Sequence, residues 1–182
     1  GDTIDIHGGG QDLIFPHHEN EIAQSEGVTG KAFANYWIHN GYININNEKM
    51  SKSTGNFFTV RDISQEIDLE VVRFFMLNAH YRHPVNFSKD LLEQSKTALN
   101  RLYNTRDNLM FLLEKAKDSD EAVESWALEL DQYKDKFKEA MDDDINTAGA
   151  IAVLFDLSKD INTHSDENSS RKALQSALAL FN

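Results

Sequence analysis

The apolar side chains of this 182-residue chain change their spacing near Ser88, and the change divides the chain into two parts. After that point leucines recur at helical spacing from residue 91 to residue 113, and three more helical segments follow. We predict helices over 88–116, 121–141, 146–163 and 170–181, with short connections typical of an antiparallel bundle. The predicted fold is therefore mostly α-helical, with a small α/β part before the bundle.

The first part of the chain mixes strand and helix patterns. Strands are predicted over 3–7 and 36–45; Gly8-Gly9-Gly10 ends the first, and Gly41 makes the second either two short strands or one bent strand. A helix is predicted over 17–27, closed by Gly27. Three N-caps are predicted from side chains that can accept hydrogen bonds from the first turn of a helix. Thr59 would cap a helix over 60–66, and Asp144 the helix over 146–163. Asp68 would cap a helix whose apolar face carries Leu69, Val72, Phe75 and Met76.

Charge and composition limit the classes of protein to which the chain belongs. It carries 18 basic and 30 acidic residues, a net charge of −12. Residues 1–82 and 83–182 are both acidic, whereas a protein that binds nucleic acid by itself normally shows a positive surface. We therefore expect the isolated chain to bind RNA weakly. No run approaches the roughly 20 apolar residues of a membrane helix, so no membrane partner is expected.

Cysteine is absent, which leaves no disulfide and no thiolate ligand within the chain and fits a cytoplasmic protein. The chain also begins with Gly1 and has no initiator methionine. We therefore expect a fragment or a processed form of a longer protein.

The segment Lys49-Met50-Ser51-Lys52-Ser53 places two lysines three residues apart among small hydroxyl side chains. A lysine ammonium is a compact charge with rotating donors, suited to a polyphosphate whose charge shifts during a reaction. Lys49 and Lys52 are therefore candidate phosphate ligands. The alternative is a pair of solvated lysines in a polar turn, which is the commoner meaning of this spacing.

His17 and Glu21 lie four residues apart on a predicted helix. That spacing places an imidazole and a carboxylate on one face, where they could share a metal ion. The alternative is a side-chain pair in the first helical turn, where Glu21 also favours the helix dipole. His18 is adjacent in sequence, is expected to point off that face, and is not a candidate.

Three further residues are candidates for a ligand pocket near the predicted strand. Asp12 follows the glycine turn that ends in Gly10 and could hold ribose hydroxyls, although a turn or capping role is commoner. His7 at the strand end either faces a ligand or is a half-buried histidine. The run Asp142-Asp143-Asp144 is interpreted as a loop with an N-cap, not as a metal site.

Together these segments resemble cysteinyl-tRNA synthetases, a class I family. The resemblance rests on blocks that occur in the family's order over nearly the whole chain. They are His7-Gly8-Gly9-Gly10, Phe15-Pro16-His17-His18-Glu19-Asn20-Glu21, Asn35-Tyr36-Trp37-Ile38-His39, the lysine segment with Gly55-Asn56-Phe57, and Met141-Asp142-Asp143-Asp144-Ile145-Asn146-Thr147.

The resemblance implies a function and a set of roles. Members of the family activate cysteine with ATP and Mg²⁺ to an adenylate, then transfer the acyl group to tRNA(Cys). A zinc ion holds the substrate thiolate in that family, which favours cysteine over serine. By position, His17 and Glu21 resemble two zinc ligands, and Lys52 beside Lys49 resembles the ATP-phosphate ligand. Gly10 and Asp12 resemble adenylate contacts, and His7 resembles a residue of the cysteine pocket.

The chain also departs from the family pattern. The other two zinc ligands of the family are cysteines from earlier in the sequence, and the HIGH motif is missing; Ile6-His7-Gly8-Gly9 is a different element. We therefore expect residues 1–83 to be the C-terminal part of a Rossmann-like catalytic domain with connecting helices, and residues 84–182 to be a helical bundle on the tRNA-binding, anticodon side. Such a chain is expected to be inactive alone.

Two other interpretations remain open from the sequence. One is a related ATP-dependent cysteine ligase with a small amine acceptor, because the adenylation residues would be shared. The other is a non-enzymatic helical interaction module.

Overall fold

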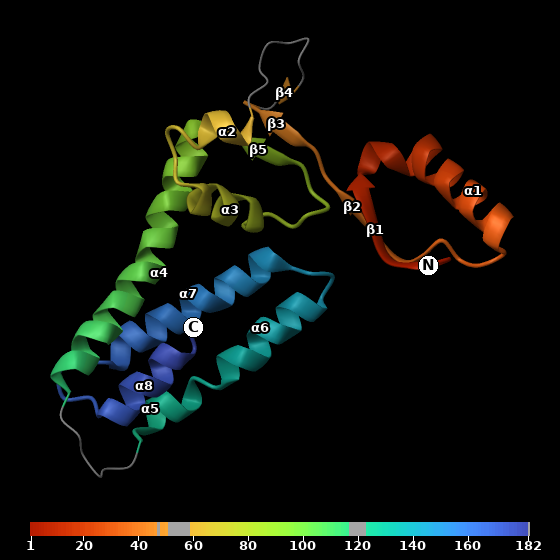
Figure 1. Ribbon diagram of the computed structural model, residues 1–182. Coiled ribbons are helices and arrows are strands. Elements are labelled where there is room, and N and C mark those ends of the chain that lie inside the picture. The colour runs from red at the N-terminus through yellow and green to blue at the C-terminus, as the bar shows by residue number, and fades with distance from the viewer. Residues whose placement is uncertain (47, 51–58, 117–122, 182) are drawn as a thin grey trace. The chain divides into compact units, whose positions relative to one another are not determined.

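The computed structural model describes residues 1–46, 48–50, 59–116 and 123–181 (Figure 1). The chain forms two compact units, one from residues 1–65 and 81–89 and the other from residues 66–80 and 90–182. The mostly helical fold with small sheets confirms the predicted fold class.

The first unit begins with two parallel strands joined by a helical connection. Strands β1 (Ile4–Gly10) and β2 (Ala34–Asn40) pair in parallel, with His7 opposite Trp37 and Gly9 opposite His39. The prediction that the three glycines end the strand is wrong, because all three lie within β1. At Gly8 a Cβ would approach the carbonyl oxygen of Ile38 at 3.1 Å, so the missing side chain permits the close pairing.

The connection between these strands contains two short turns and one helix. The turns are η1 (Gln11–Leu13) and η2 (Ile14–His18), the second interrupted by extended backbone at Phe15. Helix α1 (Glu19–Thr29) then ends at Gly30, whose φ of 66° is the left-handed conformation that glycine favours at a helix C-terminus. The predicted closure at Gly27 is wrong, since Gly27 lies inside the helix.

A second sheet in the first unit has the order β4-β3-β5. Strand β3 (Ile43–Ile45) pairs antiparallel with β4 (Glu48–Lys49) and parallel with β5 (Val85–Phe87). The division of the predicted 36–45 segment at Gly41 is confirmed. Helix α2 (Val60–Ile63) carries the predicted Thr59 cap, reinforced by Asp62 in a capping box, and is shorter than predicted.

The second unit begins with helix α3 (Leu69–Leu77), which Asp68 caps as predicted by accepting from the Glu70 N–H. Its predicted apolar face is partly wrong, because Val71, Phe74 and Phe75 are the buried residues. The long helix α4 (Lys89–Lys115) follows and confirms the prediction over 88–116. Leucines along α4 supply much of the core of this unit.

Four more helices follow α4 in the described part of the second unit. They are α5 (Ser125–Glu129), α6 (Gln132–Asp142), α7 (Thr147–His164) and α8 (Arg171–Ala179). The single helix predicted over 121–141 is thus two helices. Figure 1 shows α6 and α7 running side by side, joined by a short turn. The main core cluster joins these helices to the end of α4. Its buried members are Leu109, Leu112, Leu130, Tyr133, Leu157, Ile161, Leu174 and Ala177.

The turn before α7 differs from its prediction. Asn146, not Asp144, is the N-cap, and its side-chain oxygen accepts from the Gly149 N–H at 2.8 Å. Asp144 and Ile145 both adopt left-handed backbone, with φ of 53° and 57°. The backbone therefore turns before Asn146, which places the Asn146 side chain, not that of Asp144, at the start of α7.

Glu124 and Ser170 link the start of α5 to the start of α8. Ser170 caps α8 by accepting from the Ala173 N–H, while its own N–H and hydroxyl donate to the Glu124 carboxylate. Burial opposes ionisation of Glu124, but the hydrogen bonds from Ser170 outweigh it, and the pKa of Glu124 lies below its usual value.

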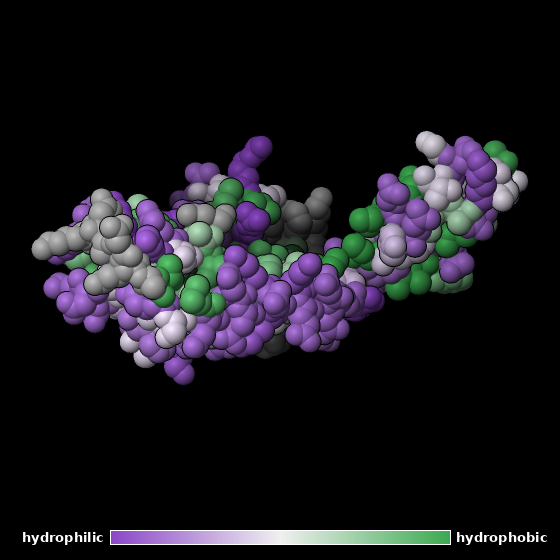
Figure 2. All heavy atoms as spheres, turned by 90° about the horizontal axis from the view of Figure 1, so that it is seen from below, coloured by the Kyte–Doolittle hydropathy of each residue, from purple (hydrophilic) through white to green (hydrophobic). Residues whose placement is uncertain are grey.

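Large apolar side chains reach the surface of the first unit. Ile6, Phe15 and Val28 are 61%, 76% and 88% exposed. Figure 2 shows hydrophobic side chains gathered over the part of the chain that contains β1 and α1. Among the described residues, none of the helices is both long enough and apolar enough to cross a membrane.

Candidate metal-binding and nucleotide-binding residues

The carboxylate of Glu21 is the centre of a group of histidines in the first unit. The parallel pairing of β1 and β2 places His7 on the same face as Trp37, and the first turn of α1 places Glu21 beside it. His7 Nε2 lies 2.8 Å from Glu21 Oε2, and both side chains are half-buried. The hydrogen bond fixes one oxygen of the carboxylate and leaves the other directed elsewhere.

The predicted pairing of His17 with Glu21 is present. His17 Nε2 lies 3.6 Å from Glu21 Oε1, and the His17 side chain is 59% exposed. Two ligands of one tetrahedral zinc ion, each about 2.0–2.2 Å from it, lie roughly 3.3–3.6 Å apart. The separation of these two atoms therefore suits a shared zinc ion, and the chemistry of the two donors suits zinc as well.

His18 is a site residue that sequence reasoning excluded, and its expected position off the Glu21 face is wrong. His18 Nε2 lies 4.0 Å from Glu21 Oε2, and His18 Nδ1 lies 2.9 Å from His39 Nε2. His18 diverges from its neighbour His17, but it lies three residues before Glu21, a spacing that also places two side chains side by side on a helix. Its imidazole fills the space beside Gly9, where a Cβ would meet it.

The two oxygens of Glu21 consequently face different partners. Oε1 faces the exposed His17, while Oε2 faces His7 and His18. Ligand atoms of His7, His18 and Glu21 all lie within 4.8 Å of one another, so this second grouping could also hold an ion. Burial, followed by the neighbouring His39, lowers the pKa of His18, which favours the neutral imidazole that a metal requires.

Aromatic rings pack around these imidazoles. Trp37 meets His7 edge to face at 4.9 Å between ring centroids and stacks on His39 at 5.9 Å. Phe33 covers His7 from another direction at 5.0 Å. Rings packed in this way restrict the rotation of the imidazoles, so the hydrogen-bonding nitrogens keep their directions.

Gly10 and Asp12 lie at the end of β1. Gly10 is the last strand residue, with an extended φ of −73°, and the Asp12 carboxylate occupies the space that a Cβ at Gly10 would need. Asp12 itself is exposed in η1. The structure thus brings these two candidates together at the carboxyl end of a parallel strand, where ligands of open α/β sheets commonly bind.

The lysine candidates are only partly described. Lys49 lies in β4, and its backbone pairs with Asn44 of β3. Lys52 lies outside the described residues, and so does the side chain of Lys49. The roles of Lys49 and Lys52 as phosphate ligands therefore stay predictions.

Comparison with protein families matches two segments of the chain. The family described as the class I (C) tRNA synthetase catalytic domain matches residues 1–97, and the DALR domain family matches residues 136–182. Curated relatives that match most or all of the chain carry the name cysteine–tRNA ligase. The relative from Clostridioides difficile (strain 630) is 61% identical over 184 residues, and the chain covers 40% of it. The relative from Caldicellulosiruptor saccharolyticus is 58% identical over 91% of the chain and 36% of its own length.

Solved structures with a similar fold are also tRNA synthetases. The LeuRS of Agrobacterium radiobacter K84, solved in a ternary complex with tRNA and LeuAMS, matches 97% of this chain and 25% of its own with a TM-score of 0.77 and 18% identity. The methionyl-tRNA synthetase of Mycobacterium tuberculosis in complex with methionyl-adenylate matches 96% of this chain and 37% of its own, with a TM-score of 0.66 and 17% identity. At these identities the likeness concerns the fold.

Proposed function

The chain belongs to the class I (C) tRNA synthetase catalytic-domain family, and we propose that it works as part of a cysteine–tRNA ligase. The chain spans about two-fifths of the length of the relatives that it matches, up to 40% of the Clostridioides difficile protein. The observation that carries the proposal is the name of those relatives, which are 54–61% identical to this chain. The proposed reaction joins cysteine, ATP and tRNA(Cys), and the proposed location is the cytoplasm.

In this proposal His17 and Glu21 are two of the ligands of a zinc ion. The 3.6 Å separation between His17 Nε2 and Glu21 Oε1 supports this role, as does the exposure of His17 toward a substrate. When bound, the ion would supply a thiolate site that prefers the sulfur of cysteine to the oxygen of serine. The remaining ligands would come from the rest of the longer protein, because this chain contains no cysteine.

His7 has a supporting role in the same proposal. Its hydrogen bond to Glu21 Oε2, 2.8 Å long, holds the carboxylate so that Oε1 faces His17. Residues that orient metal ligands are typically worth 10–100-fold in metal affinity or activity. His7 therefore serves the cysteine pocket by positioning Glu21. The rings of Trp37 and Phe33 pack against the His7 ring.

The nucleotide is assigned to Gly10 and Asp12 at the end of β1 and to the lysines of the segment 49–53. Gly10 leaves room for the Asp12 carboxylate, which would accept hydrogen bonds from ribose hydroxyls. Lys52, assisted by Lys49, would hold the phosphates of the Mg²⁺–ATP substrate. Charge accumulates on the α-phosphate and pyrophosphate as the carboxylate attacks, and ammonium groups stabilise that transition state more than the ground state.

We also propose that the two parts of the chain have different roles. Residues 1–83 would contribute to the catalytic domain, and residues 84–182 would form the tRNA-binding, anticodon-side bundle. The DALR match over residues 136–182 falls within the second range.

The proposal is tested with the full-length protein that carries this sequence. Cysteine-dependent exchange of pyrophosphate into ATP measures activation, and charging of a tRNA(Cys) transcript measures transfer. Lys52→Ala is expected to slow exchange by about 10²–10³-fold, the loss typical of removing one transition-state donor. Lys96→Ala, an exposed lysine on α4, is the matched control and should leave exchange unchanged.

Metal content gives an independent measurement. His17→Ala and Glu21→Gln should lower the bound zinc of the full-length protein, and His7→Gln should weaken it by about 10–100-fold. Exchange that depends on another amino acid, or charging of a small amine in place of tRNA, would contradict the proposed reaction. Full zinc occupancy in both ligand variants would contradict the metal assignment and leave the reaction assignment standing.

A further inference from the structure

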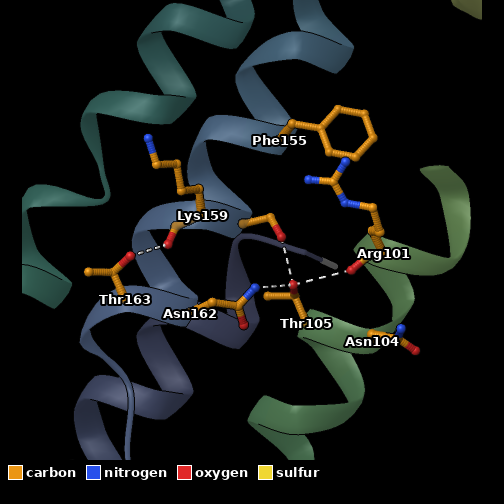
Figure 3. Close-up of a pocket in the computed structure, with 8 residues that line it drawn as sticks. Arg101, Asn104, Thr105, Phe155, Lys159, Asn162 and Thr163 are labelled. Carbon is orange, nitrogen blue, oxygen red and sulfur yellow. Dashed lines mark hydrogen bonds between the residues drawn. The ribbon is translucent and has the colours of Figure 1, made fainter.

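A hollow in the second unit has positively charged walls although the chain is acidic. It lies between α4 and α7, with a volume of about 440 Å³ (Figure 3). Arg101 lines it from α4 and Lys159 from α7. Five of the other described lining residues are uncharged and polar, and none is acidic. A local cationic site in a chain of net charge −12 favours an anionic ligand.

Neither Asp156 nor Asp160, the acidic residues of α7, lines the hollow. Asp160 accepts a hydrogen bond from the Tyr133 hydroxyl of α6. Burial, that hydrogen bond and the charges of Asp160 and Asp156 together raise the pKa of Tyr133 to about 12. Asp160 therefore contacts α6, while Lys159 is one of the residues that line the hollow between α4 and α7.

Arg101 is held in place by an aromatic ring. Its guanidinium carbon lies 5.3 Å from the centroid of the Phe155 ring, and Figure 3 shows the two side chains directed toward one another. Stacking of this kind holds the planar guanidinium in one orientation while its edge remains able to donate. A preorganised donor loses less conformational entropy when an anion binds.

The floor of the hollow is a hydrogen-bond network centred on Thr105 Oγ1. This oxygen lies 2.7 Å from Asn162 Nδ2, 2.6 Å from Ser158 Oγ and 3.3 Å from the Arg101 carbonyl oxygen. The Asn162 amide donates to Thr105, and either hydroxyl can be the donor between Thr105 and Ser158. In both cases Ser158 Oγ keeps a lone pair that can accept one more hydrogen bond at the floor, because a hydroxyl oxygen has two acceptor sites.

The hollow thus combines cationic walls with an accepting floor. A phosphate group matches the walls, because the Arg101 guanidinium can donate to its oxygens and the flexible Lys159 side chain, which Figure 3 shows directed away from Arg101, can swing toward them. A neighbouring hydroxyl group matches the floor, because it can donate to Ser158 Oγ. These two features occur together in a ribose phosphate, and inorganic phosphate supplies only the first.

We propose that the hollow between α4 and α7 binds a ribose phosphate through Arg101 and Lys159. Two sources carry this chemistry, the backbone of an RNA chain and a free mononucleotide. The proposal concerns only residues of the second unit. With RNA as the ligand it rests on the tRNA-binding role proposed for residues 84–182, whereas with a mononucleotide it does not. In neither case does it depend on the zinc, ATP or cysteine assignments.

The experiment compares two pairs of substitutions in the 182-residue chain. Arg101→Gln with Lys159→Gln removes both cations of the hollow, and Lys96→Gln with Lys138→Gln removes two exposed cations of α4 and α6. Both pairs change the net charge equally. Binding is measured with a fluorescent tRNA transcript at low and rising salt, with adenosine monophosphate, and with inorganic phosphate. Thermal unfolding midpoints check that both pairs remain folded.

The hollow pair should weaken binding of tRNA or adenosine monophosphate about tenfold, because charge-assisted hydrogen bonds are lost. The control pair should change it by less than about twofold. If only tRNA binding is lost, and the slope of log affinity against log salt concentration falls by the equivalent of about one phosphate contact, RNA is the source. Loss of adenosine monophosphate binding identifies a mononucleotide. Equal effects of the two pairs, or no binding of either ribose phosphate to the unmodified chain, would overturn the proposal.

Arg101→Lys separates charge from shape. It keeps the positive charge but loses the planar group stacked on Phe155. Retained salt dependence with weaker binding is expected. Unchanged binding would contradict a role for the stacked guanidinium.

Discussion

Gly9 and His18 are so close that a Cβ at Gly9 would lie 3.0 Å from Cε1 of the imidazole. The glycine is in β1 and the histidine precedes α1, so the missing side chain lets the start of the helix rest on the strand. His18 in turn lies 2.9 Å from His39 and 4.0 Å from the Glu21 carboxylate. A change at Gly9 should therefore reach the whole histidine group.

Gly9→Ala is expected to destabilise the chain by about 1–3 kcal/mol, because the new methyl group would overpack against His18 and Leu13. Urea unfolding measures the change. Gly27→Ala is the matched control, since Gly27 lies inside α1 with nothing within 4 Å of its Cβ position. That substitution should stabilise the chain by about 0.5–1 kcal/mol. Equal effects of the two changes would contradict the packing of His18 on Gly9.

The link between Glu124 and Ser170 should make part of the free energy of unfolding depend on pH. The pKa of Glu124 is lowered in the folded chain, so its contribution is complete above the unfolded-state pKa near 4.3 and is lost as pH falls through the folded-state pKa. Glu124→Gln should cost about 1–2 kcal/mol at neutral pH and progressively less below about pH 4. Glu129→Gln, exposed on α5, is the control. A cost that is constant with pH would contradict the ionic part of this link.

The Thr105 network should contribute to the contact between α4 and α7. Thr105→Val keeps the shape but leaves Asn162 and Ser158 without their shared partner, at an expected cost of about 1–3 kcal/mol. Thr163→Val removes an exposed hydroxyl that donates to Lys159 of its own helix and should cost less than about 0.5 kcal/mol. Thermal unfolding of both variants measures the difference. A neutral Thr105→Val would show that the network adds nothing to stability.

The isolated chain should lack the activity proposed for the longer protein. It contributes two of the proposed zinc ligands, and two donors bind zinc more weakly than the four of a closed site. Metal analysis of the purified chain is expected to give substoichiometric zinc, and pyrophosphate exchange with cysteine should be absent. Robust exchange by the 182-residue chain would contradict this prediction. Stoichiometric zinc would instead direct attention to the second grouping around His7 and His18.

The elements that the sequence predicts well are those governed by local rules. The caps at Thr59 and Asp68 are confirmed because a hydroxyl or carboxylate before a helix has few other partners. The long α4 is confirmed because its leucine spacing persists over many turns. The His17–Glu21 proximity also follows from a single helical turn.

The failures occur where distant parts of the chain decide the structure. Gly8-Gly9-Gly10 is a turn by local preference, yet pairing with β2 keeps it extended. Gly27 and Gly30 are both able to end a helix, and only the left-handed φ of Gly30 identifies the end. His18 belongs to the site through its contacts with Gly9 and His39, and both depend on the pairing of two strands that are far apart in sequence.

Strand β5 occupies one flank of β3, although residues 46–84 separate the two strands in the chain. A protein cut after residue 83, at the sequence-predicted domain boundary, would leave β3 with β4 as its only described neighbour. During synthesis the ribosome must likewise release Val85–Phe87 before that three-stranded sheet is complete. Truncation experiments on the N-terminal portion should therefore extend past residue 89, where the first compact unit ends.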